Sequence, residues 1–163
     1  TQFDENWYLA AHTVLNLFHT EQYHEEKSPY RFQRHNCVYT DTLSRDGKGA
    51  LVKSGTGLIW SGFRPSDDAC TYGYLLPSNM LASVVLTDMT EIAAKIYHDD
   101  AFVGQLRALA SEVKEAIDKY ALVPGHKKEF YAYEVDGYGQ YHIMMMPIFR
   151  DFFHAVLWLL YTG

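Results

Sequence analysis

The sequence has 163 residues, of which 48% are hydrophobic and 15% aromatic, and it carries a formal net charge of -6 at pH 7. A chain of this length can bury one core and is too short for two independent domains. Its acidic balance argues against nucleic acid or an anionic membrane as the main partner, because both select a basic surface. The two cysteines, Cys37 and Cys70, form no zinc-like or disulfide-rich pattern, which favours a reducing, cytoplasmic location.

The first residues, Thr1 to Trp7, contain no initiator methionine, basic region or apolar stretch of the signal-peptide kind. We therefore expect the chain to begin within a longer protein. No run approaches the roughly 20 apolar residues that a membrane helix needs, although residues 155–161 are strongly apolar. These features predict a soluble protein without a membrane partner.

Apolar residues recur at three- and four-residue steps from Glu5 to about Glu25, which predicts an amphipathic helix with Asp4 as its N-cap. A second helix is predicted to open at Pro77, where a missing N–H costs nothing, and to end near Asp88.

Residues 90–97 continue this helix or form a new one, and Asp100 then caps a longer helix that Pro124 and Gly125 stop. There is little of the period-2 alternation that strands produce. Successive helices joined by short links predict a mainly α fold of packed helical hairpins.

Between residues 28 and 76 the helical pattern breaks into a long segment rich in Gly, Ser, Asp and aromatic residues. A compact domain seldom has a connection of that length unless it forms a binding or catalytic surface. We therefore expect the functional residues there.

The run 56–79, TGLIWSGFRPSDDACTYGYLLPSN, places polar groups among aromatic rings. Sugars present hydroxyls at the ring edge and C–H patches on the ring faces, so aromatic platforms beside carboxylates and an arginine suit a carbohydrate site. The residues that form this combination are Trp60, Phe63, Arg64, Ser66, Asp67, Asp68, Tyr72, Tyr74 and Asn79.

Cleavage of a glycosidic bond needs one carboxylic acid to protonate the leaving oxygen and a second carboxylate to activate water or attack directly. Asp67 and Asp68 are candidates for the acid, because one of two adjacent carboxyls can stay protonated, and Arg64 could stabilise the other. Adjacent residues cannot flank the bond from opposite sides, so the partner carboxylate must come from elsewhere.

A purely structural interpretation is also open, in which Asp67 and Asp68 are turn or cap residues and Arg64 is a surface ion-pair partner. Trp60 and Phe63 would then belong to the core. The spacings of the histidines at positions 12, 19 and 24 do not predict a metal site.

Two long motifs resemble glycoside hydrolase family 125. The run 56–79 resembles the family pattern TGLxWSGFRPSDDACxYGYLIPSNM, and residues 131–139, YAYEVDGYG, resemble the pattern YAYEVDGFG. A third run, EQYHEEKSPYRFQR at 21–34, is also similar, so the resemblance covers roughly Trp7 to Tyr141.

The resemblance implies part of a six-hairpin α/α barrel and metal-independent, inverting hydrolysis of terminal α-1,6-linked mannose, with no cofactor and with a mannose-containing oligosaccharide or N-glycan fragment as partner. It places the general acid in the Asp67–Asp68 pair, for which we choose Asp67, and puts the base nearer the family's C-terminus. The predicted sugar-binding residues are Asp68, Arg64, Trp60, Ser66, Tyr72, Asn79 and Asp136. Glu134, in the second motif, is interpreted as structural.

After Tyr141 the family pattern hxMDDANxP is replaced by residues 142–149, HIMMMPIF. Loss of one G from codons for Met-Asp-Asp-Ala-Asn-Ile gives Met-Met-Met-Pro-Ile. We therefore hypothesise a partial catalytic domain over 1–144 and an aberrant, frameshifted tail over 145–163, the chain itself being inactive without the base. The alternatives are a non-catalytic helical carbohydrate-binding module and another α/α-barrel enzyme, such as a lyase or an isomerase.

Overall fold

A computed structural model describes residues 2–124 and 129–143. Three long helices dominate it: α1 (Glu5–Glu21), α4 (Leu76–Ile92) and α5 (Asp100–Tyr120). The shorter helical elements are α2 (His24–Lys27), the 3₁₀-helix η1 (Tyr39–Asp41), α3 (Ser44–Gly47) and the π-helix η2 (Ala93–Tyr97). The strands are β1 (Tyr74–Leu75), β2 (Leu122–Val123), β3 (Phe130–Tyr131), β4 (Glu134–Val135) and β5 (Tyr141–His142). The predicted mainly α class is thereby confirmed.

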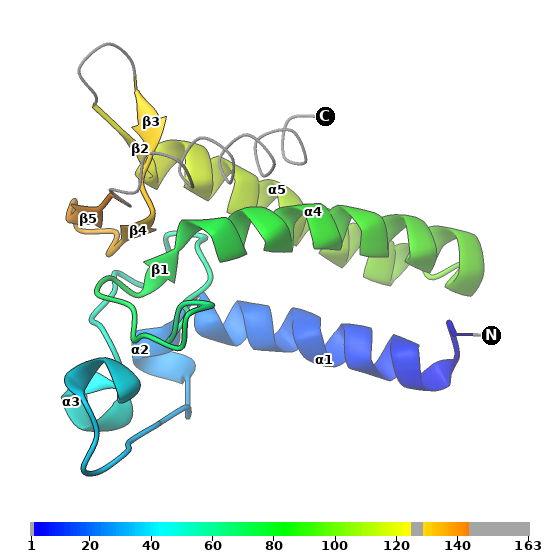
Figure 1. Ribbon diagram of the computed structural model, residues 1–163. Helices are drawn as coiled ribbons and strands as arrows, with labels where there is room; N and C mark the ends of the chain where they lie inside the picture. The colour runs from blue at the N-terminus through cyan, green and yellow to red at the C-terminus, as the bar shows by residue number, and fades with distance from the viewer. Residues whose placement is uncertain (1, 125–128, 144–163) are drawn as a thin grey trace.

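The long helices run side by side, with the loops and strands gathered at one end (Figure 1). Helices α4 and α5 form the main contact, through apolar residues at helical spacing that face a common core. The central buried side chains are Leu86 of α4 and Leu106, Leu109, Val113 and Ile117 of α5. The core therefore packs the long helices against one another.

Helix α1 completes the helical layer. Asp4 caps it as predicted, its carboxylate accepting the Trp7 N–H at 3.1 Å. Ala11 and Leu15 are buried, and His12 stacks on Phe102 of α5 with ring centroids 3.8 Å apart. The helix ends at Glu21 rather than near Glu25, and a separate short turn, α2, follows.

Two further predicted boundaries are wrong. Asp88 lies inside α4, which continues through the π-helix η2 to Tyr97 because the apolar periodicity continues past it. Asp99, and not Asp100, caps α5: its carboxylate accepts the Phe102 N–H at 2.9 Å. His98 just before it adopts a left-handed conformation, with φ of 52°, and this reverses the chain between the helices.

The strands are two residues each, too short to give a period-2 pattern in the sequence. They form an antiparallel sheet in the order β1-β4-β5, with Tyr74 opposite Val135 and Leu75 opposite Glu134, and a separate β2–β3 pair. This pairing brings the second family-like motif beside the first.

The long segment before α4 contains only short elements, as predicted. Within α3 the non-glycine residues Arg45 and Asp46 both have φ near 55°, in the left-handed region. The tail predicted over 145–163 lies outside the described residues.

Candidate functional site

Residues 61–73 fold back on themselves, and we call this segment the 61–73 hairpin. Ser61 N donates to Gly73 O at 2.8 Å and Cys70 N donates to Gly62 O at 2.9 Å. An isolated β-bridge joins Phe63 to Ala69, and β1 begins directly after Gly73. The hairpin therefore carries the predicted acid pair on its tip.

The tip is a tight turn between Arg64 and Asp68. Arg64 N donates to Asp68 O at 2.8 Å, and Asp67 N donates to Arg64 O at 3.0 Å. Asp67 has a φ of 65°, a conformation that costs a non-glycine residue energy and that is enriched at functional sites. Ser66 Oγ donates to Asp68 Oδ2 at 2.7 Å. Asp67 is exposed and Asp68 is half-buried, so both carboxylates lie at the surface.

Glu134 of β4 anchors the two arms of the hairpin. Its side chain is fully buried and accepts hydrogen bonds from Arg64 Nε at 2.5 Å and from the N–H groups of Thr71 and Tyr72 at 2.9 Å each. This ion pair raises the pKa of Arg64, and burial beside Glu134 raises the pKa of the Cys70 thiol to about 12. The second motif thus holds the first in place.

Arg64 pairs with Glu134 and not with an aspartate of the tip, which corrects the role expected for its charge. Its Nη2 donates to Thr71 Oγ1 at 3.2 Å, and its guanidinium lies over the ring of Tyr133, 5.8 Å from the centroid. Nη1 has no hydrogen-bond partner in the described part of the chain.

Tyr133 is a residue of this site that the sequence interpretation missed. Its ring is half-buried, and burial raises the pKa of its hydroxyl, with Arg64 acting in the opposite sense and Glu134 and Asp68 adding to the rise. Its place in the second motif, directly before Glu134, was the signal available in the sequence.

Trp60 lies beneath the hairpin and is 7% exposed. Its indole stacks on the buried His24 ring at 3.6 Å between centroids and 10° between planes. A Cβ at Gly73 would lie 2.6 Å from the indole Cδ1 and Nε1 atoms, so glycine is required for this approach. These contacts match the core interpretation of Trp60, and its predicted sugar contact stays a prediction.

His24 and Glu21 form a buried polar pair behind this indole. Glu21 Oε2 lies 2.6 Å from His24 Nδ1, and Glu21 Oε1 accepts from Ser28 Oγ at 2.7 Å. The other ring nitrogen, Nε2, lies 2.8 Å from Lys48 O. Both nitrogens of the imidazole therefore face an oxygen acceptor, and these contacts fix the plane on which Trp60 stacks.

Asn79 is 1% exposed and its amide is engaged with the backbone. Oδ1 accepts from Ile59 N at 2.7 Å, and Nδ2 donates to Ile59 O and Leu75 O, both at 2.9 Å. The Asn79 side chain thus links Ile59 of the loop to α4 through hydrogen bonds to both backbone groups of Ile59. Its sugar-binding role also stays a prediction, with both amide hydrogens already used.

Asp136 shapes the turn between β4 and β5. Its Oδ1 accepts from Tyr138 N at 2.7 Å and from Gln140 N at 3.0 Å, while its backbone O accepts from Lys53 N at 2.9 Å. The structure therefore brings Arg64, Ser66, Asp68 and the Tyr72 backbone together, whereas Trp60, Asn79 and Asp136 occupy separate supporting positions. Their predicted roles toward a sugar are untested.

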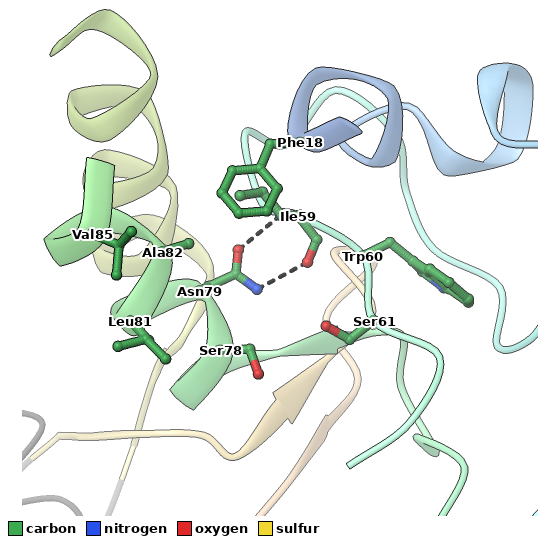
Figure 2. Close-up of a pocket in the computed structure, with 9 residues that line it drawn as sticks. All are labelled: Phe18, Ile59, Trp60, Ser61, Ser78, Asn79, Leu81, Ala82 and Val85. Carbon is green, nitrogen blue, oxygen red and sulfur yellow. Dashed lines mark hydrogen bonds between the residues drawn. The ribbon is translucent and has the colours of Figure 1, made fainter. Parts of the chain in front are cut away.

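A cavity of about 280 Å³ lies between α1, α4 and the loop that leads to the hairpin. Phe18, Leu81 and Val85 supply its apolar wall, and the hydroxyls of Ser61 and Ser78 are its small polar groups. Figure 2 shows the Trp60 ring turned away from Phe18 and Asn79. This cavity is separate from the acid-bearing tip and offers no carboxylate.

Among residues 2–124 and 129–143, no three His, Cys, Asp or Glu side chains are grouped so as to hold a metal ion. Nor does any helix in these ranges have the length and apolar character required to cross a membrane.

The family model for metal-independent α-mannosidases, glycoside hydrolase family 125, matches residues 1–146. The chain therefore belongs to this family of glycoside hydrolases. It is 33% identical over 147 residues to the meiotically up-regulated gene 157 protein of Schizosaccharomyces pombe, a match that covers 84% of this chain and 28% of that protein.

The fold is also similar to a solved structure of a metal-independent α-mannosidase of Streptococcus pneumoniae, in a non-productive substrate complex with α-1,6-mannobiose. The two chains are 44% identical with a TM-score of 0.83, and the match covers 88% of this chain and 34% of that one. The chain thus spans about a third or less of the length of these relatives.

Proposed function

We propose that the full-length protein hydrolyses terminal, non-reducing α-1,6-linked mannose by an inverting two-carboxylate mechanism. The proposal rests on one observation above all: the 61–73 hairpin presents two surface carboxylates, Asp67 and Asp68, on a tip held by the second motif. Family membership supplies the reaction class, and the mannobiose bound to the pneumococcal relative supports the linkage.

In this mechanism Asp67 is the general acid that protonates the leaving glycosidic oxygen. Asp68 and the free Nη1 of Arg64 bind sugar hydroxyls, for which charged groups make strong hydrogen bonds. The base must stand about 6.5 to 9.5 Å from the acid across the substrate to leave room for water. Since Asp67 and Asp68 are adjacent, we assign the base to a part of the full-length protein outside this chain, within a complete six-hairpin α/α barrel.

The substrate class follows as a mannose-containing oligosaccharide or N-glycan fragment. The cytoplasmic location expected from the cysteines stays a prediction; Cys37 and Cys70 are both free thiols in the structure.

The test is hydrolysis of the methyl glycoside of α-1,6-mannobiose, in which only the released terminal mannose gains a free anomeric carbon, with proton NMR to follow the anomer that first appears. We expect the full-length protein to release β-mannose and the 163-residue chain alone to release none. Release of α-mannose would contradict inversion. A full-length protein that binds mannobiose without cleaving it would favour the carbohydrate-binding alternative.

A further inference from the structure

Glu134 is a fully buried carboxylate on β4, and every polar contact that the structure gives its side chain comes from the 61–73 hairpin. Burying a charge is costly unless it is paired and hydrogen-bonded. Here Arg64, on the outgoing arm, supplies the opposite charge, and the N–H groups of Thr71 and Tyr72, on the returning arm, supply two more bonds. One carboxylate therefore joins both arms of the hairpin.

The tip between those arms is strained. Asp67 has a φ of 65° and its turn is closed by only two backbone bonds, those between Arg64 and Asp68 and between Asp67 and Arg64. Strained residues persist where the surrounding structure over-determines them. The backbone of Arg64 closes this turn, and its side chain pairs with the buried Glu134. Arg64 therefore couples the buried ion pair to the orientation of the two aspartates.

We propose that Glu134 is a positioning residue for the reaction. Acting through Arg64 and the Thr71 and Tyr72 amides, it orients the carboxylates of Asp67 and Asp68 without contacting the sugar. The inference rests on the proposed glycosidase function. It differs from a general stabilising role because Glu134 fixes the geometry of the acid, and acid catalysis is sensitive to displacements of about 1 Å.

The experiment compares Glu134→Gln, Arg64→Lys and Glu129→Gln in the full-length protein, with α-1,6-mannobiose as substrate. Glu129 is an exposed acid just before β3 and serves as the matched control. Glu134→Gln keeps the shape of the side chain but presents an amide to Arg64. Arg64→Lys, at a position whose side chain is 20% exposed, keeps the charge and loses the Nε and Nη2 bonds, so its kcat reports on the same coupling if the buried variant does not fold.

We expect both site variants to lower kcat about 10- to 100-fold, a partial loss of the roughly 10²- to 10⁴-fold that general acid catalysis contributes. KM should change less than about threefold in Glu134→Gln, whereas Arg64→Lys, which also loses the Nη1 group proposed to bind sugar, should raise KM as well. Glu134→Gln also removes a negative charge close to Arg64, Cys70, Tyr133 and Asp68. The alkaline limb of the pH–rate profile should therefore move to lower pH, a change that a merely smaller folded fraction would not produce. Glu129→Gln should match the wild type.

Wild-type kcat in both site variants would overturn the inference. So would a Glu134→Gln variant whose loss is confined to KM, or one that loses kcat with an unmoved pH profile. An inactive wild-type protein would instead remove the proposed function, and this inference with it, so the two failures are distinguishable.

Discussion

Glu25 is the most heavily paired surface carboxylate in the described part of the chain. It makes a bidentate pair with Arg45, at 2.7 and 2.8 Å, and a second pair with Lys48 at 2.9 Å. Arg45 first, and then Lys48, hold the pKa of the Glu25 carboxyl at about 2, below its ordinary value of 4.5. These ion pairs stabilise the α3 turn, in which Arg45 and Asp46 adopt the left-handed conformation that is unfavourable for non-glycine residues.

We predict that Glu25→Gln lowers the free energy of unfolding by about 1 to 2 kcal/mol at pH 7, the full linkage value being reduced by solvent screening. Because the folded-state pKa is depressed, the stabilisation is complete above pH 4.5 and is lost as the pH falls toward 2. Urea unfolding at several pH values measures it, with the exposed neighbour Glu26→Gln as control. A difference between Glu25→Gln and wild type that stays unchanged down to pH 3 would contradict this assignment.

The returning arm of the 61–73 hairpin packs against Trp60 so closely that only glycine fits at position 73. A Cβ there would meet Trp60 Cδ1, Trp60 Nε1 and Val52 Cγ1, each at 2.6 Å. In α5, by contrast, a Cβ at Gly104 would meet no atom within 4 Å.

We therefore predict opposite results for one chemical change. Gly73→Ala should destabilise the fold by about 1 to 3 kcal/mol through overpacking, whereas Gly104→Ala should stabilise it by about 0.5 to 1 kcal/mol by raising helix propensity. Denaturant midpoints at constant m-value give both numbers. Equal effects of the two substitutions would show that Trp60 does not pack against Gly73 as described.

The sequence predicted the elements that depend on residues close together in the chain, such as helical periodicity and N-caps. The apolar spacing of α5 and the Asp4 cap follow from single turns of helix, and the two-motif resemblance predicted family membership, while its assignment of the acid to the Asp67–Asp68 pair stays a prediction. The end predicted for α4 at Asp88 comes too early, and of the two alternatives for residues 90–97 the continuing helix is the one observed. An aspartate at a helix surface is as compatible with a helix interior as with a cap. The strands were missed because two-residue strands depend on their partners and not on a pattern of their own.

The pairing of Arg64 with Glu134 could not be predicted in the same way. The two residues are 70 positions apart, and only the antiparallel register that sets Leu75 opposite Glu134 brings them together. Arg64 was therefore assigned to the neighbouring aspartates, and Tyr133, which lies under its guanidinium, was overlooked. Contacts between distant segments require the fold, even where both motifs are recognisable.

On the scale of the whole molecule, the described residues form a helical layer with the acid-bearing hairpin at its loop-rich end (Figure 1). The layer leaves large apolar side chains exposed on α1 and α4, including Leu9, Leu17 and Leu81, each more than half exposed. Apolar surface of this kind is stabilising only when covered, at about 25 cal/mol per Å². The chain spans about a third or less of the length of these relatives, so a protein of their full length would have further chain available to cover these faces.

The assignment of Asp67 as the general acid is the centre of this account, and two substrates of different leaving-group acidity test it. For the full-length Asp67→Asn protein we predict a loss of about 10²- to 10⁴-fold in kcat on α-1,6-mannobiose, whose leaving oxygen must be protonated. The loss should be much smaller on an aryl α-mannoside whose phenolate leaves without a proton.

Asp68→Asn should instead raise KM for both substrates by a similar factor, since that carboxylate binds sugar in either case. The reverse pattern, with Asp68→Asn spared only on the aryl mannoside and Asp67→Asn impaired equally on both, would contradict the assignment and make Asp68 the acid.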